Sequence, residues 1–262
     1  MTTRRVVPEL TSVGVILSSL VLLMSVAVAQ TPVGPGDHPD LSGNWDNGSG
    51  IDFVAPVHIG ASICVRGCDS NPRGVQAGDR PTYRPEVMAT VNDLEARQVE
   101  EDTVLRCFAP GVPRIGPPDK IVQTATELVF LYDDYTGNFF RVVPIDGRPH
   151  RTDVEPGYLG DAIGWWEDDT LVVETVNFND DTWLTDDGSY HTTDLRVIER
   201  LSRDGDSLQW AATAYDPEVL AEPWELRVRT AYLTDVGILE APPCIERDLD
   251  HLVEPLHHDN VR

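Results

Sequence analysis

The chain has 262 residues, of which 20 are basic and 44 acidic, and its formal net charge is −24. A field of this sign repels nucleic acid and anionic lipid, which excludes both as general partners. Hydrophobic residues make up 41% of the chain, and its length allows one domain with a core of its own.

Residues 1–29 have the pattern of a secretory signal peptide. Arg4 and Arg5 precede an apolar run that ends in Ala27-Val28-Ala29. A short apolar run with a basic start and an A-x-A end is typical of a cleaved signal rather than of a membrane anchor. No later stretch of the sequence is long and apolar enough to span a bilayer. We therefore expect a periplasmic or secreted protein that has no membrane contact after cleavage.

Residues 30–118 predict an irregular N-terminal extension that packs on the rest of the domain. The segment is rich in Pro, Gly, Asp and Asn and has few periodic apolar runs. One helix is expected at Pro85–Glu101, where apolar residues recur at helical spacing. Near the start, Gly43-Asn44-Trp45 resembles the Gly-x-Trp that opens the first strand of lipocalin-like barrels. Any buried tryptophan would fit the same three residues, so they do not select a fold by themselves.

Residues 119–246 predict an antiparallel β domain, and residues 247–262 a C-terminal tail. Short apolar runs alternate with turn residues such as Asp146-Gly147 and Asp204-Gly205, and no helical pattern separates them. Seven or eight such strands predict an all-β fold, either an up-and-down barrel of lipocalin or calycin type or a sandwich. Closure into a barrel removes exposed edges. The expected strands are Ile121–Thr124, Leu128–Asp133, Phe139–Ile145, Gly160–Glu167, Thr170–Asn177, Asp194–Arg203, Ser207–Asp216 and Trp224–Leu233.

The last expected strand shows the clearest alternation of apolar and charged residues. Trp224, Leu226 and Val228 share one face, and charged residues occupy the other. We therefore expect these three side chains to face the core.

Four cysteines in an exported chain predict two disulfides rather than a metal site or catalytic thiols. Three pairings are possible. We favour Cys64–Cys68, which closes a small loop, and Cys107–Cys244, which ties the start of the strand region to its end.

Arg141 and Glu199 each lie among apolar residues on one face of an expected strand. A buried guanidinium or carboxylate without a partner is costly. An Arg141–Glu199 ion pair would satisfy both groups and would be structural. The alternative is that both face a ligand.

His150 and His191 lie in loops beside strands, where binding and chemistry usually collect in a barrel. Either could act as a general base, with Glu199 or Glu167 as the acid and Arg141 stabilising negative charge. The candidate catalytic residues are His150, His191, Glu199 and Arg141. The spacing of the histidines matches no metal motif, and we predict no metal site. The sequence contains no dinucleotide or phosphate-binding glycine motif, and it does not identify any cofactor.

Several stretches resemble a widespread family of secreted bacterial proteins of unknown function. They are "CFAPGVPR" (107–114), "FLYDDYTGNFFRVVPIDGRPH" (130–150), "YLGDAIGWWEDDTLVVETVNFNDDTW" (158–183) and "HTTDLRVIERL" (191–201). This chain departs from the pattern at Trp165 and Asp168, where the family tends to have arginine and glycine. The resemblance implies a shared fold and pocket but no activity. The pattern keeps Arg141, His150, Trp166, Glu167, Trp183, His191 and Glu199.

Three functions are compatible with these patterns. The first is an exported barrel that binds a small polar or aromatic molecule in its interior, with Trp166, Glu167, Trp183, Arg148 and Asn177 as ligand-binding residues. The second is a hydrolase, lyase or isomerase with a His/Glu/Arg site at the barrel mouth, with or without the assistance of a metal ion. The third is a structural protein of the cell envelope that makes contacts through its N-terminal third.

Overall fold

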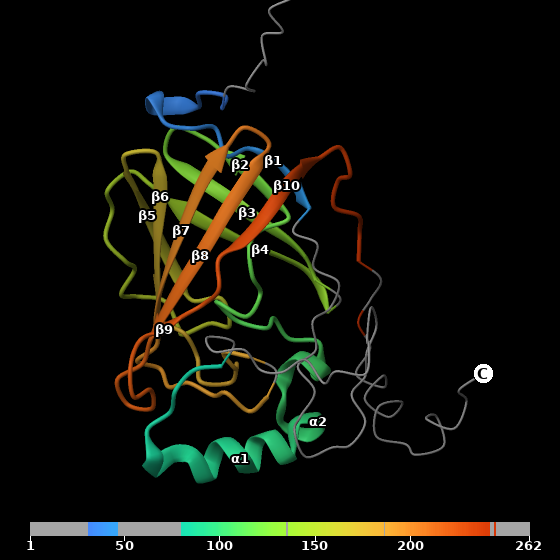
Figure 1. Cartoon of the computed structure of the whole chain (residues 1–262), viewed down its shortest axis with the longest axis vertical. Helices are drawn as coiled ribbons and strands as arrows, with labels where there is room; N and C mark the ends of the chain where they lie inside the picture. Colours follow the sequence, from blue (N-terminus) through green and yellow to red (C-terminus); the bar gives the residue numbers. More distant parts are fainter. Residues whose placement is uncertain (1–30, 47–79, 135, 186, 242–243, 245–262) are drawn as a thin grey trace, which may run out of the picture.

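The computed structural model describes residues 31–46, 80–134, 136–185, 187–241 and 244 (Figure 1). This part of the chain forms a nearly closed antiparallel barrel, which confirms the all-β expectation and selects the barrel over the sandwich. The strand order is β4-β3-β2-β1-β10-β8-β7-β6-β5, and β9 pairs with β8 off this path. The strands are β1 (Gly43–Asp46), β2 (Lys120–Gln123), β3 (Glu127–Asp134), β4 (Gly137–Pro144), β5 (Asp161–Glu167), β6 (Thr170–Val176), β7 (Arg196–Asp204), β8 (Ser207–Tyr215), β9 (Trp224–Glu225) and β10 (Arg229–Thr234).

The barrel follows the chain in an up-and-down order, and its first and last strands pair with each other. β1 lies between β2 and β10, with Asn44 opposite Thr234 and Trp45 opposite Leu233. Trp45 is almost fully buried, and its indole Nε1 donates a hydrogen bond to the carbonyl oxygen of Leu41 at 3.0 Å. The segment expected as an irregular extension therefore contributes one strand to the barrel.

The barrel closes between β4 and β5 without a ladder of backbone hydrogen bonds. Gly164 in β5 lies at this seam. A Cβ atom on Gly164 would be 2.9 Å from Cγ1 of Val143 and 3.1 Å from Cγ2 of Ile145. The absence of a side chain at Gly164 thus lets the two edge strands approach.

Short helical segments cover the ends of the barrel. The helix expected at Pro85–Glu101 is present as the 3-10 turn η2 (Pro85–Val87) followed by α1 (Met88–Ala96) and α2 (Gln98–Glu101). These helices lie at one end of the barrel, and the segment with η1 (Pro35–Asp37) lies at the other (Figure 1). Beyond α2, η3 (Thr103–Arg106) begins after Asp102, which accepts a hydrogen bond from the backbone of Val104 and is paired with Arg114 through two hydrogen bonds.

The interior follows the two-residue period of the strands. Alternate side chains of β3, β6, β7 and β8 are fully buried, and their neighbours are not, except in β6, where both faces are covered. The largest interior side chains include Phe130, Tyr132, Leu171, Leu201 and Trp210.

The expectation for the last strand is wrong at Val228, which is 56% exposed. β9 and β10 both pair with β8, but in registers that differ by one residue: Ala214 is opposite Trp224, whereas Trp210 is opposite Arg229. One extra residue between the two strands forms a β-bulge, which exchanges the faces of the strand. Trp224 therefore points inward before the bulge, and Ala231 points inward after it.

The Cys107–Cys244 disulfide is confirmed, with the two Cα atoms 5.6 Å apart. It ties the start of the strand region to the chain that follows β10. The expected signal peptide, the Cys64–Cys68 disulfide and the tail at 247–262 lie outside the described residues. Over the described ranges, no helix has the length and apolar character needed to cross a membrane.

We predict that Gly164→Ala lowers the free energy of unfolding by about 1–3 kcal/mol, because the added methyl group overpacks the seam against Val143. Urea denaturation measures the change. Gly157→Ala is the matched control, since a Cβ atom at Gly157 has no atom within 4 Å. Equal effects of the two substitutions would contradict the close approach of β4 and β5.

Candidate functional site

Arg141 and Glu199 form an ion pair inside the barrel. Nη2 of Arg141 lies 2.6 Å from Oε2 of Glu199, and the two residues are 4% and 0% exposed. The pair draws on three further strands. Arg141 donates to the hydroxyl oxygens of Tyr132 at 3.0 Å and Thr175 at 2.7 Å, and Trp210 donates its Nε1–H to Oε1 of Glu199 at 3.0 Å. These five side chains are called the interior network below.

The interior network keeps Arg141 charged. Burial by itself would lower the pKa of Arg141, but Glu199 and Tyr132 raise it above its ordinary value. Burial raises the pKa of Tyr132, because it disfavours the charged phenolate, and the phenol therefore stays protonated. Among the described residues, Nε of Arg141 is buried without a hydrogen-bond partner. The interior pair expected from the sequence is therefore formed, and its charges are satisfied by protein groups.

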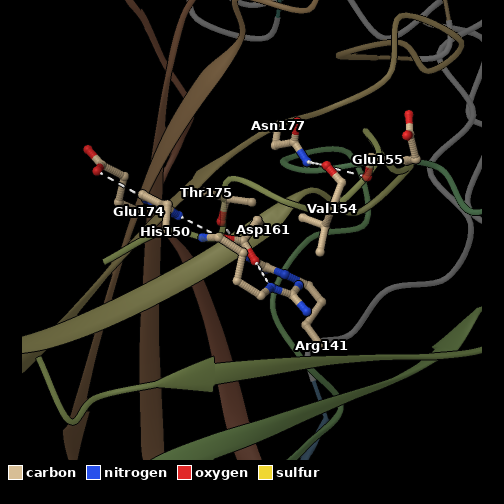
Figure 2. Close-up of polar contacts among 9 residues, drawn as sticks. Arg141, His150, Val154, Glu155, Asp161, Glu174, Thr175 and Asn177 are labelled. Carbon is tan, nitrogen blue, oxygen red and sulfur yellow. Dashed lines mark hydrogen bonds and ion pairs between the residues drawn. The ribbon is translucent and has the colours of Figure 1, made fainter. Parts of the chain in front are cut away.

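His150 lies on the outer side of the barrel, between two carboxylates (Figure 2). Its Nδ1 is 3.0 Å from Oδ2 of Asp161 in β5, and its Nε2 is 3.3 Å from Oε1 of Glu174 in β6. Asp161 also accepts hydrogen bonds from the side chain and the backbone of Arg151. Although burial raises the pKa of Asp161, the hydrogen bonds from Arg151 and His150 outweigh it, and the pKa lies below its usual value.

Glu174 connects His150 to a surface groove. Its Oε2 accepts a hydrogen bond from Nη1 of Arg196 at 2.9 Å, and the guanidinium of Arg196 lies 4.4 Å from the ring centre of Tyr215. Arg196 and Tyr215 are opposite each other in β7 and β8. They line a groove of about 500 Å³ together with Arg84, Asp194, Leu220 and Glu222. The name outer groove is used for this site below.

His191 occupies a different environment. It is 1% exposed, and both ring nitrogens have partners: Nδ1 donates to the carbonyl oxygen of Thr192 at 2.9 Å, and Nε2 accepts from the hydroxyl of Thr182 at 2.7 Å. The edge of the ring packs against Phe178. Burial lowers the pKa of His191, so the neutral ring is favoured. These contacts fit a structural role.

The five expected ligand-binding residues do not form one site in the described part of the chain. Trp166 is half-buried, and its ring stacks on that of His38 with 4.6 Å between the ring centres. The Nε1 atom of Trp166 is buried and has no hydrogen-bond partner among the described residues. Trp183 is buried, and its backbone forms an isolated antiparallel β-bridge with Tyr190. The other three are tied to neighbouring groups on the surface or in loops: Glu167 pairs with Arg200, Arg148 pairs with Asp146, and Asn177 donates to the carbonyls of Val154 and Glu155.

The candidate catalytic residues fall into three separate sets of contacts. Arg141 and Glu199 contact each other inside the barrel, whereas the His150 ring is hydrogen-bonded to Asp161 and Glu174. The His191 ring is bonded to Thr182 and Thr192. Within the described residues the four therefore do not share hydrogen bonds as one catalytic group would.

Sequence reasoning missed Tyr132, Thr175 and Trp210 in the interior network, although each shares strand parity with buried neighbours and could have been found from that alternation. Glu174 also had a signal, as the one acid in an apolar strand. Arg196 and Tyr215 had no signal in the sequence, because only the pairing register of β7 with β8 brings the two residues together.

Comparisons with known proteins identify no relative: no protein-family model, no curated protein and no solved structure matches the chain. The family resemblance in the sequence therefore stays a prediction. Across the ranges that the structure describes, no group of three His, Cys, Asp or Glu side chains is arranged to hold a metal ion.

We predict that Arg141→Met lowers the free energy of unfolding by about 3–5 kcal/mol, because it leaves the Glu199 carboxylate buried without its cation. Urea denaturation of Arg141→Met, Glu199→Gln and the double variant measures the coupling, and we expect the double variant to lose less than the two single losses combined. Arg148→Met is the control for loss of an arginine. Its partner is solvent-accessible, and the expected change is about 0.5 kcal/mol or less. Strict additivity at positions 141 and 199 would contradict the pair.

We predict that the buried His191 makes the free energy of unfolding depend on pH. Because burial lowers its pKa, the unfolded chain takes up a proton at this histidine before the folded protein does, and stability falls as the pH drops below about 6.5. His191→Gln lacks this loss. We therefore expect the destabilisation caused by His191→Gln, measured by urea denaturation, to be smaller at pH 5 than at pH 8. A difference that grows toward pH 5 would show that the folded state binds the proton more tightly.

Proposed function

We propose that the protein binds a small uncharged polar molecule, of sugar or phenol type, in the outer groove. The observation that carries this proposal is the combination of Tyr215, stacked under Arg196, with charged side chains of both signs in one concavity of about 500 Å³. Small-molecule sites commonly have about this volume, ~300–1,000 Å³, and combine apolar walls with a few polar groups.

The charge of the outer groove favours a neutral ligand. Arg84 and Arg196 supply donors, whereas Asp194 and Glu222 supply acceptors, so neither an anion nor a cation meets only complementary groups. A ligand with several hydroxyl groups can donate to the carboxylates and accept from the guanidinium groups at once. Leu220 and two prolines add apolar wall.

The sequence patterns predict a ligand in the barrel interior, and we keep the interior as the alternative binding site. The buried charges there are paired with each other, so a ligand would have to compete with the hydrogen bonds between Arg141, Glu199 and Trp210. Arg196 and Tyr215 are only half-buried and can be reached without breaking the barrel. We therefore favour the outer groove.

Export to an oxidising compartment is part of the proposal. It is supported by the signal-peptide pattern of residues 1–29 and by the Cys107–Cys244 disulfide, a bond that persists mainly outside the reducing cytosol.

A second candidate function is an enzyme in which His150 acts as the general base. The observation in its favour is the half-buried ring of His150 between Asp161 and Glu174, which Glu174 connects to Arg196 in the outer groove through a second hydrogen bond. A carboxylate that orients a histidine is a common feature of acid–base catalysis. Turnover of a bound compound, abolished by His150→Ala, would favour the enzyme over the binder.

We predict that the purified protein binds a member of a panel of glucose, galactose, maltose, phenol and catechol, measured by thermal shift and then by calorimetry. Ligand at about 100 times its Kd stabilises the folded state by ~2.7 kcal/mol. Arg196→Gln should weaken binding about tenfold, as expected for the loss of ~1.4 kcal/mol.

Arg200→Gln is the matched control for this experiment. Arg200 lies in the same strand on the same face as Arg196, and it also pairs with a glutamate, but it does not line the outer groove. Tyr132→Phe tests the interior, since it removes one hydroxyl of the interior network. Binding weakened by Tyr132→Phe and unchanged by Arg196→Gln would contradict the outer groove and favour the interior site.

A further inference from the structure

The outer face of β2–β4 carries exposed apolar side chains. Cross-strand pairing aligns this face in two rows. Phe140 is 66% exposed, and Val122 and Val142 are each 42% exposed. The rows are Val122–Val129–Val142 and Lys120–Leu131–Phe140, and they are called the β2–β4 strip below.

The chain that follows β10 forms one wall of a groove over the β2–β4 strip. Residues 237–240 line this groove of about 570 Å³ together with Lys120, Val122, Leu131 and Asn138. The backbone N–H of Ala241 donates to Oδ1 of Asn138 at 2.7 Å. Asn138 points outward from β4, two residues before Phe140, so Ala241 lies at one end of the strip.

The remaining chain starts close to this groove. Cys244 lies three residues after Ala241 in the sequence, and its disulfide fixes it to Cys107. Residues 245–262 follow Cys244. From Asn138 to Val142 the strip extends for only about 13 Å, at ~3.3 Å per residue. The 18 residues 245–262 can span at most about 60 Å as an extended chain and about 27 Å as a helix. The segment is therefore long enough to cover the whole strip.

The composition of 245–262 complements the strip in polarity. Ile245, Leu249 and Leu252 recur at intervals of four and three, the spacing that would gather apolar side chains on one side of a helix, and Leu256 follows directly after Pro255. Asp248, Asp250 and Glu254 lie between them. The strip contains Lys120, the single lysine of the chain, and Glu240 is the other charged residue that lines the groove.

We propose that residues 245–262 bind across the β2–β4 strip of the same molecule, with their apolar side chains on Phe140, Val122 and Val142 and their acids near Lys120. A second copy of the chain is the main competing occupant. The net charge of −24 opposes self-association, whereas the disulfide holds the segment at the strip at a high effective concentration.

Photo-crosslinking tests this proposal in the full-length oxidised protein. A benzoylphenylalanine in place of Phe140 is expected to crosslink to a peptide from 245–262 within a product of monomer mass. Leu249→Ser/Leu252→Ser should reduce that crosslink at least fivefold, and Lys120→Glu should reduce it about twofold. The matched control Asp259→Ser/Asn260→Ser changes neighbouring residues outside the apolar repeat and should leave it unchanged.

The same probe at Trp165, which is 38% exposed on the outer side of β5, controls for random encounters of the segment. Equal crosslinking to 245–262 from positions 140 and 165 would overturn the proposal. A product of dimer mass from position 140 would overturn it in favour of a second copy. The absence of any crosslink from position 140 to 245–262 would also overturn it.

Discussion

The ion pair between Arg141 and Glu199 is the constraint on which the interior of this barrel depends. Two charges without access to water are tolerated only when they neutralise each other and their remaining hydrogen-bonding atoms find partners. Here the partners come from β3, β6 and β8 in addition to β4 and β7. A shift of register by one residue would turn either charge to the outer face and leave the other alone inside. The pair therefore links the registers of strands that are far apart in the barrel.

The same pair bears on where function can reside. A network that satisfies its charges internally has little left to offer a ligand. Of the five side chains of the interior network, Arg141 has one buried atom, Nε, without a hydrogen-bond partner among the described residues. The outer groups differ, because Arg196, Glu174 and His150 are partly open to water and still held by specific contacts. Groups that are both positioned and accessible are better suited to recognition. The interior thus stabilises and orders the barrel, and the outer groove is the better candidate for binding.

The two surfaces proposed for recognition lie on different parts of the barrel wall. The outer groove is lined by the ends of β7 and β8, where charged side chains surround an aromatic ring. The β2–β4 strip is mainly apolar and lies beside the chain that leads to Cys244. Polar and mixed linings suit small hydroxylated ligands, whereas exposed apolar faces on soluble proteins usually mark protein contacts. The chemistry of each surface therefore selects a different kind of occupant.

From the sequence alone, the β-rich architecture, most of the strands, the helix near Met88 and the need of Arg141 for an acidic partner could be predicted. These conclusions rest on local rules: a two-residue period, turn residues and the cost of an unpaired buried charge. The Cys107–Cys244 bond was favoured among three possible pairings, and only the structure selects it. Tertiary structure alone decided that Trp45 belongs to the barrel, that a bulge turns Val228 outward, and that Arg196 lies over Tyr215. It also separated His150 from His191. Each of these depends on strand register and on closure between segments distant in the chain, and neither is encoded in the spacing of neighbouring residues.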